Sequence, residues 1–281
     1  MKAFLVSVFF LLSYFSKAQY YYTDIVGTKE TAVIIKLYQQ NKVGRVALNS
    51  FDADGMKSEG FFVQQVFSSS AQTLKTITRS GVTNESILTT YFNPKGQIIK
   101  TIDSSLVSVS SSGYNYNTAG QLISILSVSK DSTNTMTQRE EHKWEYDKER
   151  IVKMLRIKNG IDTSIVHFVL DQNGNVTEET SARKGIKTEP FLYYYDAQNR
   201  LTDVVRFNSK ARRLLPVLMF EYSPSNQVIQ KITVPGSSNY LIWRYQYGTN
   251  GLKMREAVYN KQKELNGKIE YEYVFKEFPL P

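Results

Sequence analysis

Histidine and cysteine supply many of the nucleophiles, proton carriers and metal ligands of proteins, and this sequence offers few of them. It has no cysteine and two histidines, His142 and His167, which stand 25 residues apart. This spacing fits no metal-binding cluster, and a chain without cysteine has no Cys–His pair. Each histidine leads into a stretch of alternating apolar residues, so we interpret both as ordinary strand residues.

Other motifs that carry chemistry are equally scarce. We find no Gly-x-Ser-x-Gly elbow, no phosphate-binding loop and no dinucleotide fingerprint. The acidic turns 52–55 and 171–174 look like calcium loops, but each has its glycine at position 4, whereas a calcium loop needs it at position 6. We therefore predict no metal, no cofactor and no enzymatic activity. A Ser/His/Asp site assembled in space stays open as an alternative.

A basic run offers the best local binding candidate. Lys210, Arg212 and Arg213 follow one another closely in a chain of formal net charge +9. Such a cluster favours contact with anionic polymers or surfaces, although a solvated hairpin tip has the same composition. We predict a protein or an anionic envelope glycan as partner and exclude nucleic acid, because an exported protein does not meet it.

A short phrase returns along most of the chain: two aromatics on alternate residues, a polar turn residue, then glycine. Residues 114–120 (YNYNTAG) are a clear copy. The second aromatic, or its substitute, recurs at steps of 24 to 30 residues, at Phe92, Tyr116, Tyr146, Leu170, Tyr195, Tyr222, Tyr247 and Tyr273. A near-constant step of this size indicates a repeat architecture.

Each repeat predicts a β-hairpin. Alternating aromatics are typical of a strand with one buried face, so we interpret Tyr116, Tyr146, Tyr195, Tyr222 and Tyr247 as structural repeat residues. We expect Tyr146, Tyr195, Tyr222 and Tyr247 to be stacked in adjacent repeats and mostly buried. Asp or Asn follows the anchor, and Gly120, Gly174 and Gly251 should adopt positive φ to close the turn. Arg150 replaces the glycine in one copy, which predicts a strained or re-formed turn there.

Eight copies predict an all-β fold of about sixteen antiparallel strands. Open sheets rarely exceed about ten strands, so this one should curl into a spiral, a flattened barrel or a sandwich. We place the repeat domain at residues 51–281. Residues 19–50 lie before it and are a candidate cap or plug for the aromatic face.

The phrases 144–147 (WEYD), 193–196 (YYYD) and 114–117 (YNYN) resemble the tyrosine–aspartate (YD) repeats of Rhs-type proteins. The resemblance covers about residues 88 to 275. It implies β-hairpins in a long spiralling strip and a short, exported bacterial protein without a toxin tip. It also implies an association with carbohydrate or cell surfaces. The chain departs from large Rhs proteins in having far fewer repeats.

The first 18 residues have the features of a signal peptide. Lys2 precedes the apolar stretch 3–15, and Ser16 and Ala18 are the small residues of a cleavage site before Gln19. We therefore expect export to the periplasm or beyond.

These features together favour a non-catalytic exported scaffold that binds a protein or glycan partner. The first alternative is an outer-membrane β-barrel, and the second is an enzyme with a site inside the curled sheet. We do not expect membrane insertion, because Lys100, Glu178, Asp203 and Arg255 are in phase with aliphatic positions of their strands. Charges that face lipid are costly.

Overall fold

The computed structural model describes residues 19–81, 83–209, 211–234 and 239–276. The predicted signal peptide, residues 1–18, and the basic residue Lys210 lie outside these described residues. The described chain forms two helical elements and then strands only. The elements are η2 (Tyr21–Val26), α1 (Gly27–Gln40), β1 (Val43–Asp52), β2 (Phe62–Ser68), β3 (Thr73–Ser80), β4 (Thr83–Phe92), β5 (Ile98–Ser105), β6 (Ser108–Tyr116), β7 (Leu122–Asp131), β8 (Thr137–Asp147), β9 (Arg150–Lys158), β10 (Asp162–Leu170), β11 (Val176–Arg183), β12 (Ile186–Lys187), β13 (Phe191–Tyr195), β14 (Leu201–Asn208), β15 (Arg213–Tyr222), β16 (Val228–Thr233), β17 (Leu241–Tyr247), β18 (Lys253–Tyr259) and β19 (Leu265–Phe275).

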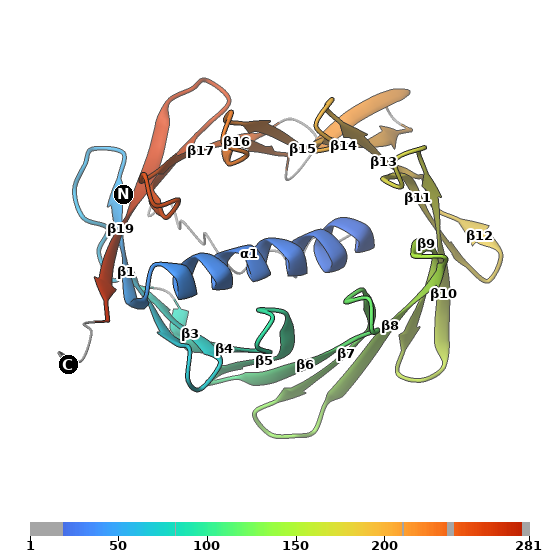
Figure 1. The fold of residues 1–281 in the computed structure, drawn as a ribbon, viewed down its shortest axis with the longest axis horizontal. Coiled ribbons are helices and arrows are strands. Elements are labelled where there is room, and N and C mark those ends of the chain that lie inside the picture. The colour runs from blue at the N-terminus through green and yellow to red at the C-terminus, as the bar shows by residue number, and fades with distance from the viewer. Residues whose placement is uncertain (1–18, 82, 210, 235–238, 277–281) are drawn as a thin grey trace.

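The strands form a closed antiparallel barrel (Figure 1). Neighbouring strands in sequence pair with each other, and β1 pairs with β19 from Val43↔Phe275 to Asp52↔Gly267. The two-residue strand β12 pairs at the side of β11, which pairs directly with β13. In the described residues this gives nineteen strands, eighteen of them in the closed wall. The predicted all-β antiparallel meander is confirmed, with three more strands than expected.

The extra strands come mostly from the beginning of the chain. Strand β1 starts at Val43, so the predicted division between residues 50 and 51 falls inside this strand. Asp52 and Gly55 form the same kind of turn as the later repeats, because the Gly55 N–H donates to the Asp52 carbonyl over 3.0 Å. The barrel wall therefore begins before the first recognisable repeat.

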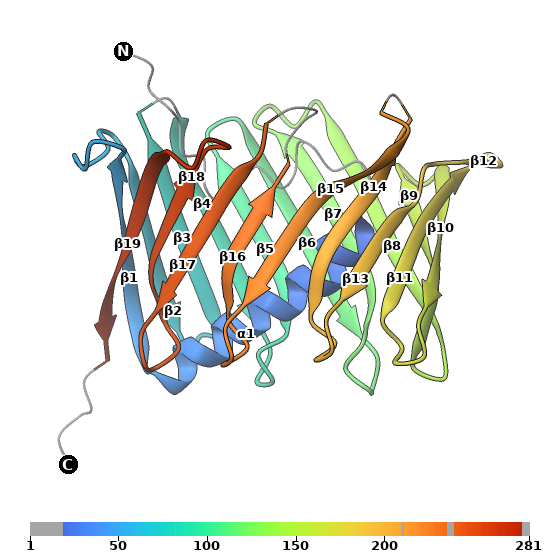
Figure 2. The same ribbon diagram turned by 90° about the horizontal axis from the view of Figure 1, so that it is seen from above.

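Helix α1 lies inside the barrel and crosses it at a slant (Figures 1 and 2). A barrel of this many strands is too wide for its own side chains to fill. The helix occupies part of that space and buries Ile35 and Tyr38, which are three residues apart and so share one helical face. The sequence predicted no helix in this segment.

The hydrophobic core lies between the helix and the inner face of the wall. In β10, for example, Ser164, Val166 and Phe168 are buried, whereas the residues between them face outward. One cluster surrounds Tyr22 and Ile25, and a second surrounds Ile35 and Tyr38. The wall therefore holds the helix along both of its halves.

The repeat turns have the geometry that the sequence predicts. Gly120, Gly174 and Gly251 have φ of 82°, 83° and 79°. The Gly174 N–H donates to the Asp171 carbonyl over 3.1 Å, and Asn199 takes the equivalent place in the 196–199 turn with a φ of 58°. Positive φ is confirmed at all three glycines.

The turn at Arg150 is re-formed. Asp147 pairs directly with Arg150, and the two residues between them, Lys148 and Glu149, have φ of 45° and 70°. Two successive positive φ values are typical of a two-residue type I′ hairpin. The loss of glycine is thus accommodated by a shorter loop.

The repeat tyrosines bind the preceding repeat through their hydroxyl groups. The hydroxyls of Tyr146, Tyr195, Tyr222, Tyr247 and Tyr273 donate to backbone carbonyls 19 to 24 residues earlier, at 2.7 to 2.9 Å. Tyr116 makes no such bond among the described residues. These contacts form a ladder around the barrel that we call the tyrosine ladder.

The predicted stacking of the anchors is wrong, because no ring contact joins anchors of adjacent repeats within the described chain. The anchors are mostly buried, as predicted, but they keep more exposed surface than the core aromatics. The fully buried aromatics stand two residues earlier, at positions such as Trp144, Tyr193 and Phe220. A phenol that must reach a carbonyl at the barrel end cannot also lie at the centre of the core.

Removing one rung of the tyrosine ladder should have a measurable cost. We expect Tyr222→Phe to lower the free energy of unfolding by about 1 kcal/mol, the usual net value of one hydrogen bond. Tyr116→Phe should change it by less than about 0.5 kcal/mol, because that hydroxyl has no backbone partner. Urea titration of the two variants measures the difference, and equal losses would contradict the ladder.

The turn glycines give a second stability test. A Cβ at Gly174 would meet no atom within 4 Å, so the effect of a side chain comes from backbone conformation alone. Gly174→Asn should cost less than about 1 kcal/mol, and Gly174→Val about 2 kcal/mol, because a β-branched residue tolerates positive φ poorly. If urea titration gives the same stability for both, the turn assignment fails.

Candidate binding site

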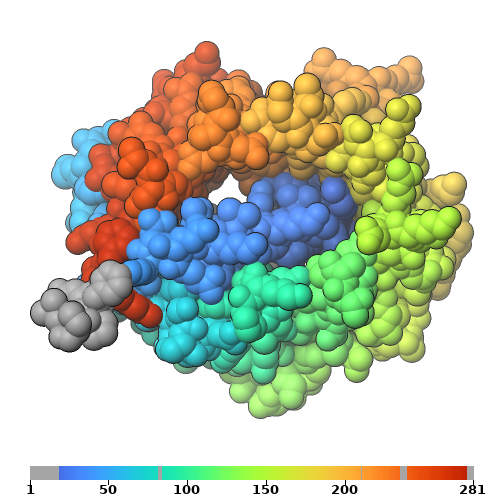
Figure 3. All heavy atoms as spheres, viewed as in Figure 1, coloured from blue at the N-terminus to red at the C-terminus, as the bar shows by residue number. Residues whose placement is uncertain are grey.

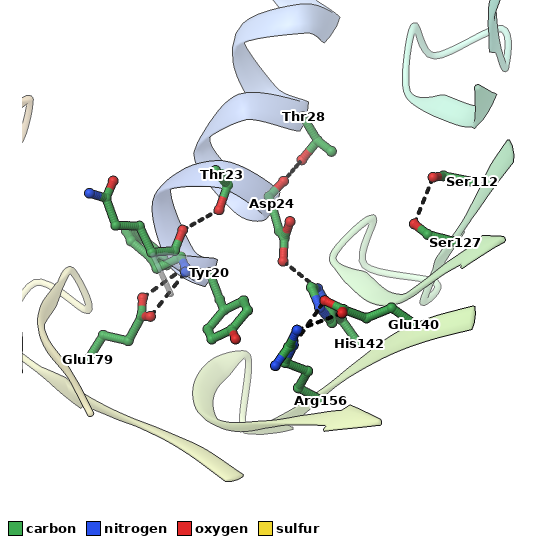
Figure 4. A network of polar contacts seen from close by, with 12 residues as sticks. Tyr20, Thr23, Asp24, Thr28, Ser112, Ser127, Glu140, His142, Arg156 and Glu179 are labelled. Carbon is green, nitrogen blue, oxygen red and sulfur yellow. Dashed lines mark hydrogen bonds and ion pairs between the residues drawn. The ribbon is translucent and has the colours of Figure 1, made fainter. Parts of the chain in front are cut away.

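The beginning of the helical segment is held by a buried carboxylate. Glu179 on β11 is 1% exposed and accepts hydrogen bonds from the N–H groups of Tyr20 and Tyr21 at 3.0 and 2.9 Å (Figure 4). The Tyr193 hydroxyl donates to the same carboxylate over 2.8 Å. Burial raises the pKa of Glu179 to about 7, although these three hydrogen bonds act in the opposite direction. The carboxylate satisfies N–H groups that have no partner within the helix.

A second polar contact joins the helix to β8. The protonated His142 ring donates through Nδ1 to Asp24 over 2.8 Å and through Nε2 to Glu140 over 2.9 Å. Arg156 on β9 donates two hydrogen bonds to Glu140. Burial alone would lower the pKa of His142, but the bonds to Asp24 and Glu140 outweigh it and raise the pKa to about 9. His142 is therefore a charged link between two carboxylates (Figure 4).

The two histidines have different environments, which sequence reasoning did not distinguish. His167 faces outward on β10 and is exposed, as an ordinary strand residue would be. For His142 the interpretation as an ordinary strand residue is incomplete, because this ring also links the wall to the helical segment. Its partner there, Asp24, is 118 residues away in sequence. The one sequence signal was the pair Glu140 and His142 on alternate strand positions, which places them on one face.

A pocket of about 370 Å³ lies between the helix and the turn end of the wall. On the helix side, the pocket is lined by Thr28, Lys29 and Ala32, among others. The wall contributes Tyr116 and Tyr146, together with turn residues such as Gln121. Tyr116 and Tyr146, which the sequence predicts as structural anchors, therefore also line this pocket.

Two groups in this pocket are available to a ligand. The Tyr116 hydroxyl lies outside the tyrosine ladder, and burial raises the pKa of this phenol to about 12, so it is protonated at neutral pH. Lys29 makes no hydrogen bond or ion pair among the described residues, and burial lowers the pKa of its amine. By contrast, Gln121 is already engaged, since its amide donates to the Glu149 carbonyl over 2.7 Å.

The predicted basic site is only partly described. Arg212 and Arg213 lie in the turn between β14 and β15 and at the start of β15, and both are exposed. Lys210 lies outside the described residues. The binding role of these three residues stays a prediction.

The described residues hold neither a metal-binding cluster nor a helix that could cross a membrane. No group of three or more His, Cys, Asp or Glu side chains there is arranged to hold a metal ion. Neither helical element in that part of the chain is long and apolar enough to cross a membrane.

No family model matches the chain, and no curated protein matches it. Among solved structures, it is similar to a porin-like protein from Bacteroides uniformis, with 8% identity over 83% of this chain and 98% of that one and a TM-score of 0.39. It is also similar to a chain of the TcdB2–TccC3–Cdc42 structure, with 13% identity over 82% of this chain and 14% of that one and a TM-score of 0.36. A chain of the Photorhabdus luminescens Tc holotoxin pore gives 10% identity over 81% and 15%, and a TM-score of 0.32.

At these identities and TM-scores, the similarity assigns no role to any residue of this chain. The resemblance to YD repeats therefore stays a prediction.

The His142 contacts predict how stability depends on pH. The pKa of His142 in the folded protein, about 9, lies above the unfolded value of 6.5. Its contribution to stability is therefore full below pH 6.5 and is lost as the pH rises through 9. Between pH 6.5 and pH 9 the free energy of unfolding of the wild type should therefore fall. In His142→Gln we expect this fall to be smaller by more than about 1 kcal/mol.

Urea titrations at the two ends of the window measure this change. His167→Gln is the matched control, because that ring is exposed and should leave the pH profile as it is in the wild type. A wild-type profile in the His142 variant would contradict the charged link.

Proposed function

We propose that this protein is a non-catalytic exported scaffold that binds an acidic glycan in the pocket lined by Tyr116 and Lys29. The observation that carries the proposal is the free Tyr116 hydroxyl. Five other repeat tyrosines use their hydroxyls to hold the preceding repeat, whereas Tyr116 lines the pocket and its hydroxyl has no hydrogen-bond partner among the described residues.

The chemistry of the pocket suits a sugar with an acid group. A tyrosine offers an apolar ring for the face of a sugar and a hydroxyl for its edge. Lys29 adds one positive charge, which favours a carboxylate or sulfate on the ligand. The volume of about 370 Å³ is within the range of small-molecule sites and fits one or two sugar rings.

We propose no catalytic step for the buried polar groups. Glu179 is fully used by two backbone N–H groups and one phenol, and His142 is held by a carboxylate on each ring nitrogen. Groups with all their partners inside the protein are suited to support. They hold the helix in the barrel and so shape the pocket beside it.

The outer face of the wall supports a water-facing scaffold over an outer-membrane barrel. Glu145 and Lys153 are direct partners on β8 and β9 and form an ion pair of 2.9 Å. Glu178 pairs with the exposed Val169, and Asp203 pairs with the exposed Tyr194. A lipid-facing wall has a continuous apolar band, whereas here charges alternate with the apolar residues.

The export and repeat features complete the proposal. A signal peptide at residues 1–18 and YD-like repeats are expected of an envelope or secreted protein that contacts carbohydrate. A protein partner at the basic tip, Arg212 and Arg213, is the second candidate, favoured by its exposed positive charge.

Titration with purified oligosaccharides tests the pocket. We expect oligogalacturonate to bind more tightly than the neutral chitotetraose. Lys29→Met should weaken oligogalacturonate binding about tenfold, which corresponds to about 1.4 kcal/mol. Tyr116→Ala should weaken both sugars, because it removes the ring as well as the hydroxyl.

Lys95→Met is the control, since Lys95 is an exposed lysine in a turn of the wall. Binding that survives both pocket variants, but is lost in the double variant Arg212→Ser/Arg213→Ser, would move the site to the basic tip. If no variant and no sugar shows binding, the glycan proposal is wrong.

A further inference from the structure

A second open space lies on the other side of the helix. Figure 3 shows an opening through the molecule between α1 and the orange part of the wall, which holds β15 to β17. Glu30, Val33, Ile34 and Leu37 share the helical face opposite the buried Ile35. Val33 is 57% exposed and Ile34 is 39% exposed, although the barrel surrounds the helix. The helix therefore presents an uncovered apolar strip inside the barrel.

The wall across from this strip presents a lysine. Lys231 on β16 pairs with Phe220 on β15 and Trp243 on β17, so it points to the inner side with these aromatics. Its amine donates to the Tyr22 hydroxyl over 3.3 Å and lies 5.7 Å from the ring centres of Tyr22 and Phe220. No other hydrogen bond and no ion pair involves this amine within the described chain.

Glu30 is the carboxylate that faces this lysine. It stands two helical turns after Tyr22, which touches Lys231, and it is exposed. The surrounding wall limits the solvation of Glu30 by bulk water and so raises its pKa, whereas the charges of Lys231 and Lys253 lower it. Glu30 nevertheless makes no hydrogen bond or ion pair among the described residues. The neighbouring Lys253 is already paired with Glu256 at 3.0 Å.

Two opposite charges thus face the same space without touching, beside an apolar strip. We propose that this space binds a small zwitterion with an apolar side chain, a free amino acid. The ligand carboxylate contacts the Lys231 amine, and the ligand ammonium contacts Glu30. The aliphatic side chain covers Val33 and Ile34. This site is separate from the glycan pocket, which lies against the Lys29 and Ala32 face of the helix.

Charge complementarity selects this ligand over simpler ones. A simple anion would gain Lys231 but would be repelled by Glu30, and a simple cation would meet the reverse arrangement. A ligand with both charges satisfies both groups at once. The apolar strip favours a ligand with an aliphatic side chain, because contact between that side chain and the strip removes apolar surface from water.

Calorimetric titration with three small probes tests the site. L-leucine has both charges, 4-methylpentanoate lacks the ammonium and 3-methylbutylamine lacks the carboxylate. We expect L-leucine to bind and each of the other two to bind at least tenfold more weakly. Equal binding of 4-methylpentanoate and L-leucine would overturn the role of Glu30, and no binding of L-leucine would overturn the proposal.

Two charge-removing variants locate the binding. Lys231→Met and Glu30→Gln should each weaken L-leucine binding at least tenfold. Glu30 is exposed and makes no hydrogen bond or ion pair among the described residues, so its variant tests the site even if Lys231→Met does not fold. Lys75→Met is the control, because Lys75 is exposed on β3 between the buried Leu74 and Thr76 and so faces outward. L-leucine binding that is unchanged in Glu30→Gln would overturn the assignment.

Discussion

The pairing of β1 with β19 is the contact on which the rest of the structure depends. It joins the first and last strands of the meander in nine paired positions, from Val43↔Phe275 to Asp52↔Gly267. Without it the sheet would have two open edges, with rows of unpaired N–H and C=O groups. Closure also turns the aromatic face inward all round, and so creates the lumen in which the helix is held. The Tyr116–Lys29 pocket and the Glu30–Lys231 space both border the helix that lies in that lumen.

The helix fills only part of the space that closure creates. Its buried face packs on the wall through Tyr22, Ile25, Ile35 and Tyr38. Its polar start is fixed by Glu179, whose cost of burial is offset by three hydrogen bonds. The two remaining faces border the pocket lined by Tyr116 and Lys29 and the Glu30–Lys231 space. The lumen is wider than the helix, so cavities remain beside the helix. The contacts that anchor the helix to the wall determine where these cavities lie.

The repeat gives the wall its regularity through contacts at one end. The tyrosine ladder joins a repeat to the repeat before it. Side chains in the turns join the same repeat to the repeat after it. Gln97 donates to the Gly120 carbonyl over 3.0 Å, and Arg200 donates to that of Ser223 over 3.2 Å. Such contacts require similar spacing between successive turns, which is consistent with the near-constant repeat step. Where a repeat departs, as at Tyr116, a polar group becomes free for another use.

Much of the wall was predictable from the sequence, because it is specified locally. Alternating aromatics determine which face of a strand is buried, and Asp171 with Gly174 determines where the chain turns. These signals act within a few residues, so the antiparallel meander and the positive φ of the glycines follow from them.

The helix, the closed barrel and the candidate sites were decided only by the tertiary structure. Asp24 meets His142 across 118 residues, and Tyr20 meets Glu179 across 159. The position of the anchor tyrosines likewise depends on carbonyls in another repeat. Nothing in the local sequence distinguishes closing β1 on β19 from continuing as an open spiral. That choice depends on the total number of strands, on their combined twist and on a helix that can occupy the lumen, and these are properties of the whole chain.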